Sequence, residues 1–240
     1  MATTEVVNTN LRWEIEEARC LIESVFGNEQ REFFNRYTKP FIHRQYHAQY
    51  HFQEIQRLLN VEIDEKLVEK HIVEILFVEF TNFQPTLVKI EAHMIACAQS
   101  IHSITDIFAH AVYYALGLNL TEKPLKDKDV NFKNVINKIT DERFLKARNS
   151  MSELLNSNLY KALENIVIQG KHRGLKEPVI SVSFEENKKP YSLKFPSFVF
   201  DEKQQSEREF EEFLSPIYAM TSQMTVRSGI LINEVLSSKD

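Results

Sequence analysis

Apolar residues recur every three or four positions along most of the chain, which is the pattern of amphipathic helices. The clearest segment begins near Pro85, which suits a first helical turn, and ends near Gly117. An unbroken apolar seam of this kind is typical of the inner face of a helical bundle. The seam consists of Leu87, Ile90, Met94, Cys97, Ile101, Ile104, Phe108, Ala111, Ala115 and Leu118.

The same periodicity predicts helices along the rest of the chain. Pro40 lies inside the second predicted helix and should bend or divide it. Asp64 is a suitable N-cap for the third. The predicted helices cover residues 11–26, 28–59, 64–80, 85–117, 130–139, 141–173 and 204–236.

Two segments near residue 190 alternate with period two instead, which predicts a β-hairpin with strands at 179–184 and 191–200. Pro196 should confine the second strand to a sheet edge or a bulge. We therefore predict a single domain over 1–240. It is mainly all-α, an up-down bundle of about six to seven helices with a hairpin insertion at 178–201.

Composition narrows the class of protein. Hydrophobic residues make up 43% of the chain and charged residues 26%, which is typical of a globular protein. The net charge of −5 gives no general attraction to nucleic acid or acidic membranes, so an RNA site would need a local basic patch. Cys20 and Cys97 both fall at core spacing and are expected as buried thiols.

The first ten residues lack the parts of a signal peptide, and no run reaches the roughly 18–20 apolar residues of a membrane span. We therefore expect a cytoplasmic protein with no membrane partner. The chain has no GxxxxGK[ST], GxGxxG, GxSxG or CxxC motif, which argues against a P-loop kinase or a Rossmann oxidoreductase. No cofactor is expected.

Polar residues interrupt the apolar pattern of the 85–117 segment. His102, Asp106 and His110 follow one another at intervals of four, so neighbouring pairs can touch on one helix face. They could form a buried hydrogen-bond network, a binding site that includes His102 and Asp106, or a metal site.

A second ladder comprises His43, His47 and His51, with tyrosines between them. Arg44 follows His43 and disfavours a bound cation, so no metal site is predicted. The ladder is then a solvated or aromatic-stacked face, or it contacts an anion or nucleotide through Arg44.

The stretch "ENIVIQGKHRGL" closes a predicted helix, with Gly174 suited to a left-handed C-cap. Asn165 and His172 are seven residues apart and share one helix face. Lys171, His172 and Arg173 form either a basic helix end that interacts with the helix dipole or part of a site.

The sequence "AQSIHSITDI" followed by "KHR" at a later helix end resembles the HEPN superfamily, over about residues 40–176. The resemblance implies an all-α fold and frequent homodimers. In active members it implies metal-independent RNA cleavage by an Arg, a polar residue and a His. An imidazole with a pKa of about 6.5 suits such proton transfer.

By this resemblance Asn165 takes the polar position and His172 the histidine, with Lys171 and Arg173 as available cations. Glu164 stands where the family has Arg and would repel phosphate. We therefore expect a non-catalytic module that binds RNA, a nucleotide or a protein partner, of bacterial defence or toxin–antitoxin type. The alternative is a metal-independent endoribonuclease that uses His172.

Overall fold

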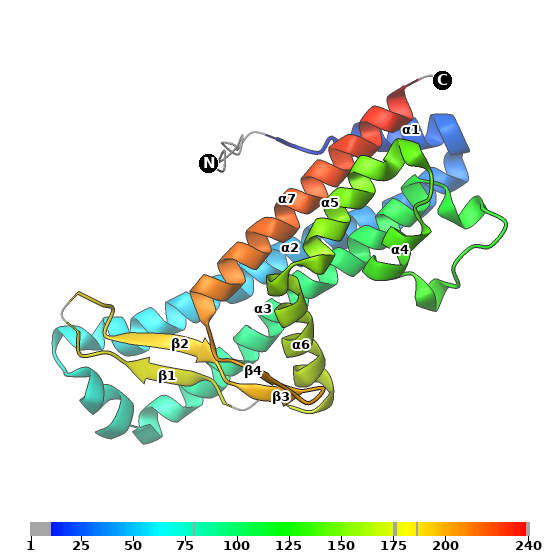
Figure 1. Ribbon diagram of the computed structural model, residues 1–240. Coiled ribbons are helices and arrows are strands. Elements are labelled where there is room, and N and C mark those ends of the chain that lie inside the picture. The colour runs from blue at the N-terminus through cyan, green and yellow to red at the C-terminus, as the bar shows by residue number, and fades with distance from the viewer. Residues whose placement is uncertain (1–10, 79, 175–176, 186, 239–240) are drawn as a thin grey trace, which may run out of the picture. The chain divides into compact units, whose positions relative to one another are not determined.

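The computed structural model describes residues 11–238 except 79, 175–176 and 186 (Figure 1). Helices dominate, which confirms the prediction of a mainly all-α fold. None of the described helices is long and apolar enough to cross a membrane. The α-helices are α1 (Ile15–Phe26), α2 (Asn28–Leu59), α3 (Phe80–Ala115), α4 (Phe132–Lys138), α5 (Leu145–Asn156), α6 (Asn158–His172) and α7 (Phe210–Ser237).

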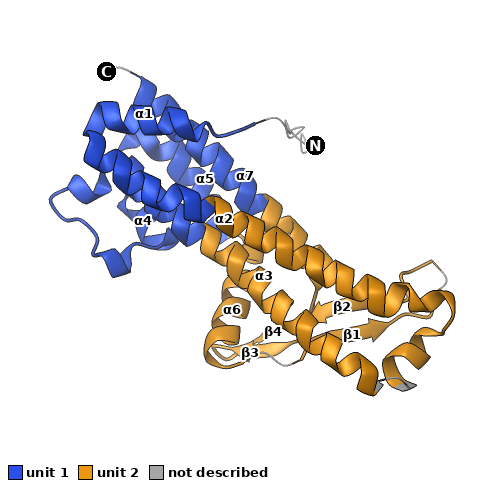
Figure 2. Cartoon of the chain, turned by 180° about the vertical axis from the view of Figure 1, so that it is seen from behind, with its two compact units in different colours: residues 1–41, 105–156, 220–240 blue, residues 42–104, 157–219 orange. Residues whose placement is uncertain are grey.

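The chain forms two compact units, each assembled from separated stretches of sequence (Figure 2). Unit 1 comprises residues 1–41, 105–156 and 220–240, and unit 2 comprises residues 42–104 and 157–219. The helices α2, α3 and α7 each contribute residues to both units. The prediction of a single domain over 1–240 stays a prediction.

The core of unit 1 is organised around Trp13, the single tryptophan of the chain. Its indole is 7% exposed and makes edge-on contacts with the rings of Phe34 and Phe108 at centroid distances of 6.0 and 5.8 Å. The indole Nε1 donates a hydrogen bond to Asn233 Oδ1 at 3.3 Å. Asn233 Nδ2 in turn donates to the carbonyl oxygen of Glu14 at 3.0 Å, so the segment before α1 is held against the end of α7.

Gly229 of α7 makes the close approach of the indole possible. A Cβ atom at this position would meet the ring of Trp13 well inside van der Waals contact. Gly229 is therefore needed for packing, although glycine inside a helix normally costs about 0.5–1 kcal/mol relative to alanine.

Unit 2 contains parts of α2, α3 and α7, all of α6, and the strands. The strands are β1 (Val179–Val182), β2 (Tyr191–Phe195), β3 (Phe198–Phe200), β4 (Lys203–Gln205) and β5 (Arg208–Glu209). They form a three-stranded antiparallel sheet in the order β1-β2-β5 and a separate antiparallel pair β3-β4. Alternate residues of β2 are buried, as the period-two pattern predicts.

The predicted hairpin is confirmed, since Val179 pairs with Lys194 and Val182 with Tyr191. The prediction for Pro196 is wrong, because β2 is the central strand of its sheet and ends before the proline. Pro196 instead lies in the gap between β2 and β3, where no ladder hydrogen bond is needed from its nitrogen.

The predicted helix over 64–80 is wrong. The chain instead forms a π-helical turn at Asn60–Asp64, a 3-10 turn at Lys66–Val68 and a second π-helical turn at Glu74–Val78, and residue 79 lies outside the described residues. Asp64 does not cap a helix and accepts a hydrogen bond from the Tyr191 hydroxyl at 2.9 Å. Burial and this contact raise the pKa of Tyr191.

The start of α3 also differs from the prediction. The helix begins at Phe80, so Pro85 lies inside it and not in its first turn. The added helical turn lies before the proline and contains Phe83, which is only 4% exposed. Burial of this side chain favours helix there.

The long helix predicted from Asp141 is divided into α5 and α6 at Ser157. Ser157 has extended backbone angles, and its hydroxyl accepts a hydrogen bond from the Tyr160 amide at 3.1 Å, as an N-cap does. The last helix begins at Phe210 and not at residue 204, because residues 203–205 and 208–209 pair as strands. Cys97 is buried as expected, whereas Cys20 is exposed.

Replacing Gly229 by Ala is expected to lower the free energy of unfolding by about 1–3 kcal/mol, because the added methyl group overlaps the indole. Gly→Ala inside a helix normally raises the free energy of unfolding, so the expected decrease is opposite to the usual effect. Urea unfolding followed by circular dichroism measures it. In a Trp13→Leu background the same replacement should cost less, since the smaller side chain leaves room. An equal cost in both backgrounds would show that the indole is not the cause.

Candidate functional site

The end of α6 carries the residues that the HEPN resemblance singles out. The helix ends because Gly174 takes a left-handed conformation with φ of 71°. The amide of Arg173 still donates to the carbonyl of Gln169 at 2.9 Å, and Gln169 Nε2 donates to the carbonyl of Gly174 at 3.1 Å. The expected glycine C-cap is therefore present, and it leaves three consecutive basic residues, 171–173, exposed.

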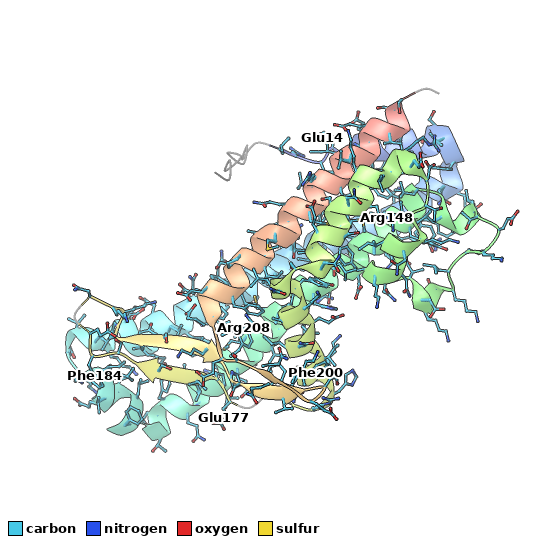
Figure 3. All side chains as sticks on the ribbon, viewed as in Figure 1. Glu14, Arg148, Glu177, Phe184, Phe200 and Arg208 are labelled. Atoms are coloured by element: carbon cyan, nitrogen blue, oxygen red, sulfur yellow. The ribbon has the colours of Figure 1, made fainter. Side chains whose placement is uncertain are left out.

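The segment that contains β3 and β4 packs beside α6 and contacts Asn165 and Arg173. Asn165 Nδ2 donates to Gln205 Oε1 at 3.3 Å. The Arg173 guanidinium carbon lies 5.2 Å from the ring centroid of Phe200, labelled in Figure 3, and a guanidinium nitrogen lies 3.8 Å from an Asp201 oxygen. The polar residue and one of the two cations that the resemblance singles out therefore contact the β3–β4 segment.

His172 is the last residue of α6, and its side chain is exposed, as is that of Lys171. Neither makes a hydrogen bond, ion pair or ring contact with any residue that the structure describes. A general base is held in position by a polar group that orients it. The described surroundings of His172 supply no such group, and Glu164 lies half-buried on the same helix.

His102 and Asp106 each make a packing contact within their own unit. The His102 ring stacks on Tyr160 of α6 at a centroid distance of 5.8 Å within unit 2. Within unit 1, Asp106 Oδ1 accepts the amide hydrogen of Phe132 at 3.0 Å, at the first residue of α4. A carboxylate at a helix N-terminus is favoured by the helix dipole, so Asp106 anchors α4.

His110, the third member of this ladder, also serves the packing of unit 1. Its Nδ1 donates to the Asp106 carbonyl oxygen at 2.9 Å, and its ring stacks on Tyr37 at 4.6 Å. Tyr37 stacks in turn on Tyr114 at 5.6 Å, and Tyr114 on Phe33 at 5.0 Å. Burial is the main cause that raises the pKa of Tyr114.

The α2 ladder lies on the surface of unit 2, as one of the sequence interpretations expects. Tyr46 and Tyr50 are 63% and 54% exposed, which is high for large aromatic side chains. His43 and His47 are exposed beside them, at the i, i+3, i+4 spacing of one helix face. These four side chains are called the α2 face below. Arg44, half-buried, flanks it.

The sequence signal for the α2 face is the absence of acidic residues. No Asp or Glu occurs between Glu32 and Glu54, in a chain whose net charge is −5. Glu54 at the far end of this run forms an ion pair with Arg57 at 2.9 Å, which balances its charge. The α2 face therefore carries no unbalanced negative charge of its own.

His51, beside the α2 face, pairs with His93 of α3, which sequence reasoning missed. Their Nδ1 atoms lie 2.9 Å apart, so one imidazole donates its hydrogen to the other. The Tyr50 ring contacts both imidazoles edge-on, at 5.2 and 6.1 Å. Nothing in the sequence spacing links these residues, because α2 and α3 meet only in the folded chain.

Burial is the largest cause that lowers the pKa of His51 below its ordinary value. The neighbouring His93, His47 and Arg44 lower this pKa further. Among the described residues there is no group of three or more His, Cys, Asp or Glu that could hold a metal ion. The expectation that the protein takes no metal stays a prediction.

Comparison with protein-family models, with curated proteins and with solved structures finds no match for this chain.

The low pKa of His51 predicts a loss of stability in mild acid. The unfolded chain takes up a proton at this histidine near pH 6.5, whereas the folded protein does so only at lower pH. The unfolded state thus binds more protons, so the free energy of unfolding falls as the pH drops below about 6.5. Replacing His51 by Gln should make this fall smaller.

Urea unfolding at pH 7.5 and at pH 5.5 compares the wild type with His51→Gln. His71→Gln removes an exposed histidine of the same unit and serves as the matched control, which should retain the wild-type decrease. An equal decrease in the wild type and His51→Gln would rule out the His51–His93 pair as the source.

Proposed function

We propose that this protein is a non-catalytic module that binds single-stranded RNA on the α2 face. The observation that carries the proposal is the pair of exposed tyrosines, Tyr46 and Tyr50, set among histidines on a helix segment free of acidic residues. Proteins that bind single strands combine stacking aromatic rings with a positive path for the backbone.

Each part of the α2 face has a role in such binding. Unpaired bases stack on Tyr46 and Tyr50, which are 63% and 54% exposed. Arg44 contributes a permanent positive charge for a phosphate, and the imidazoles of His43 and His47 donate hydrogen bonds to phosphate or base oxygens. Because stacking accepts every base, we expect little sequence preference.

A binding role also agrees with the state of the α6 end. Asn165 and Arg173 contact the β3–β4 pair, and Glu164 stands where the resemblance would require an arginine. A phosphate there would meet a carboxylate, and His172 would act without an orienting partner. The resemblance to HEPN proteins thus supports RNA binding of a defence or toxin–antitoxin type more than cleavage, and homodimers and a protein partner remain predictions.

Substituting Tyr46 or Tyr50 by Ala is expected to weaken binding of a short labelled RNA strand. Each loss of stacking should cost about 1–3 kcal/mol, or about fivefold or more in affinity. Fluorescence anisotropy measures the affinity, with Phe184→Ala as the control because Phe184 is 75% exposed elsewhere in unit 2. Arg44→Gln should also reduce the salt dependence of binding by about one phosphate contact.

Binding that survives both tyrosine substitutions would refute the α2 face as the site. Duplex RNA should bind more weakly than the single strand, since its bases are not free to stack. Equal affinity for the two forms would show that stacking does not drive recognition.

Purified wild-type protein and His172→Ala are both expected to leave RNA intact in the presence of EDTA. The physical reason is that His172 contacts no described group that could orient it, and that Glu164 repels phosphate. Gel analysis of a set of structured and unstructured RNAs tests this. Cleavage by the wild type that disappears in His172→Ala would establish the endoribonuclease alternative.

A further inference from the structure

A pocket of about 320 Å³ lies within unit 2, between α2, α3 and the first turns of α7. Its walls are apolar and contain Ala48, Phe52, Cys97, Ile101 and Leu214. Four of these five side chains are 1% exposed or less, and Phe52 is half-buried. A volume of this size reaches the lower end of the range of small-molecule sites.

The rim of the pocket is polar but uncharged. Gln49, Gln53 and Ser215 are exposed at the rim, and Tyr218 is half-buried there. None of the described residues that line the pocket is an Asp, Glu, Lys, Arg or His. A charged ligand would lose hydration in this pocket without gaining an ionic partner, so the lining favours a neutral one.

The thiol of Cys97 belongs to the wall and not to a reactive centre. It donates a hydrogen bond to the carbonyl oxygen of Ala48 at 3.3 Å. Burial raises the pKa of this thiol to about 12. A neutral thiol is a poor nucleophile, so a ligand of this pocket is held by non-covalent contacts.

One hydrogen bond at the rim defines where the polar end of a ligand would lie. Gln49 Nε2 donates to the Tyr218 hydroxyl oxygen at 2.9 Å. The hydroxyl hydrogen of Tyr218 and the Oε1 atom of Gln49 can therefore serve a ligand as donor and acceptor.

We propose that this pocket binds a neutral, largely apolar small molecule that carries a single hydrogen-bonding group. The apolar body lies against Phe52, Ile101 and Leu214, and the polar group meets Gln49 and Tyr218 at the rim. The residues that line the pocket include none of the four residues of the α2 face, so the two proposals depend on different side chains. Failure of one proposal leaves the other standing.

The experiment compares two fluorescent probes with the same ring skeleton. N-phenyl-1-naphthylamine is neutral and has one N–H donor, and 8-anilinonaphthalene-1-sulfonate adds a negative charge. The neutral probe should bind saturably at one site, with a rise in fluorescence as it leaves water. The sulfonate should bind about tenfold more weakly or worse, since the lining offers it no cation.

Ser215→Trp should place a large side chain over the mouth and weaken the neutral probe by about tenfold or more, a loss of about 1.4 kcal/mol. Glu212→Trp puts the same side chain on an exposed position of α7 outside the lining and should leave affinity unchanged. Gln49→Ala removes the rim hydrogen bond and provides a second variant that leaves the core untouched.

Equal binding of the two probes would overturn the proposal of a neutral ligand. Unchanged affinity in both Ser215→Trp and Gln49→Ala would overturn the location of the site. Circular dichroism of each variant confirms that the helices are retained, so that a loss of binding is assigned to the pocket.

Discussion

The fit of the Trp13 indole against Gly229 is the contact on which unit 1 depends. The ring is buried among phenylalanines of α2 and α3, and its N–H group is satisfied by Asn233, which also holds the backbone before α1. A buried indole without a partner for its N–H would cost roughly 1–3 kcal/mol, so packing and hydrogen bonding are satisfied together. Residues more than 200 positions apart in sequence are joined in this way.

In unit 2, the contact between α6 and the β3–β4 pair engages two polar side chains of α6 and the residue after it. The amide of Asn165 and the guanidinium of Arg173 are polar groups suited to an anion, but both contact strand residues. The ion pair of Arg173 with Asp201 is exposed and contributes little stability. Its consequence is positional, because it holds the guanidinium beside Asp201 and the ring of Phe200.

The segment of α2 in unit 2 presents different chemistry on its two sides. The inward side packs against α3 and α7 and lines the uncharged pocket. The outward side carries exposed tyrosines and histidines, whereas Arg44, His51 and its partner His93 are half-buried. The proposed RNA site depends on the exposed tyrosines of that side.

Hydrophobic periodicity was sufficient to predict the helical class, the bounds of α2 and the β1–β2 hairpin, because these depend on local patterns of 3.6 and 2 residues. The division between α5 and α6 follows the local N-cap at Ser157, whereas the late start of α7 was decided by tertiary structure. Strands β4 and β5 have polar sequences that resemble a helix, and they form only because β3 and β2 offer them backbone partners. The sequence likewise identified His172, Asn165 and Arg173 as polar groups of one helix, but the residues that Asn165 and Arg173 contact belong to the β3–β4 segment. The His51–His93 pair, the pocket between three helices and the fit of Trp13 on Gly229 join residues with no sequence relation. Such contacts arise only when the helices pack, and local pattern carries no information about them.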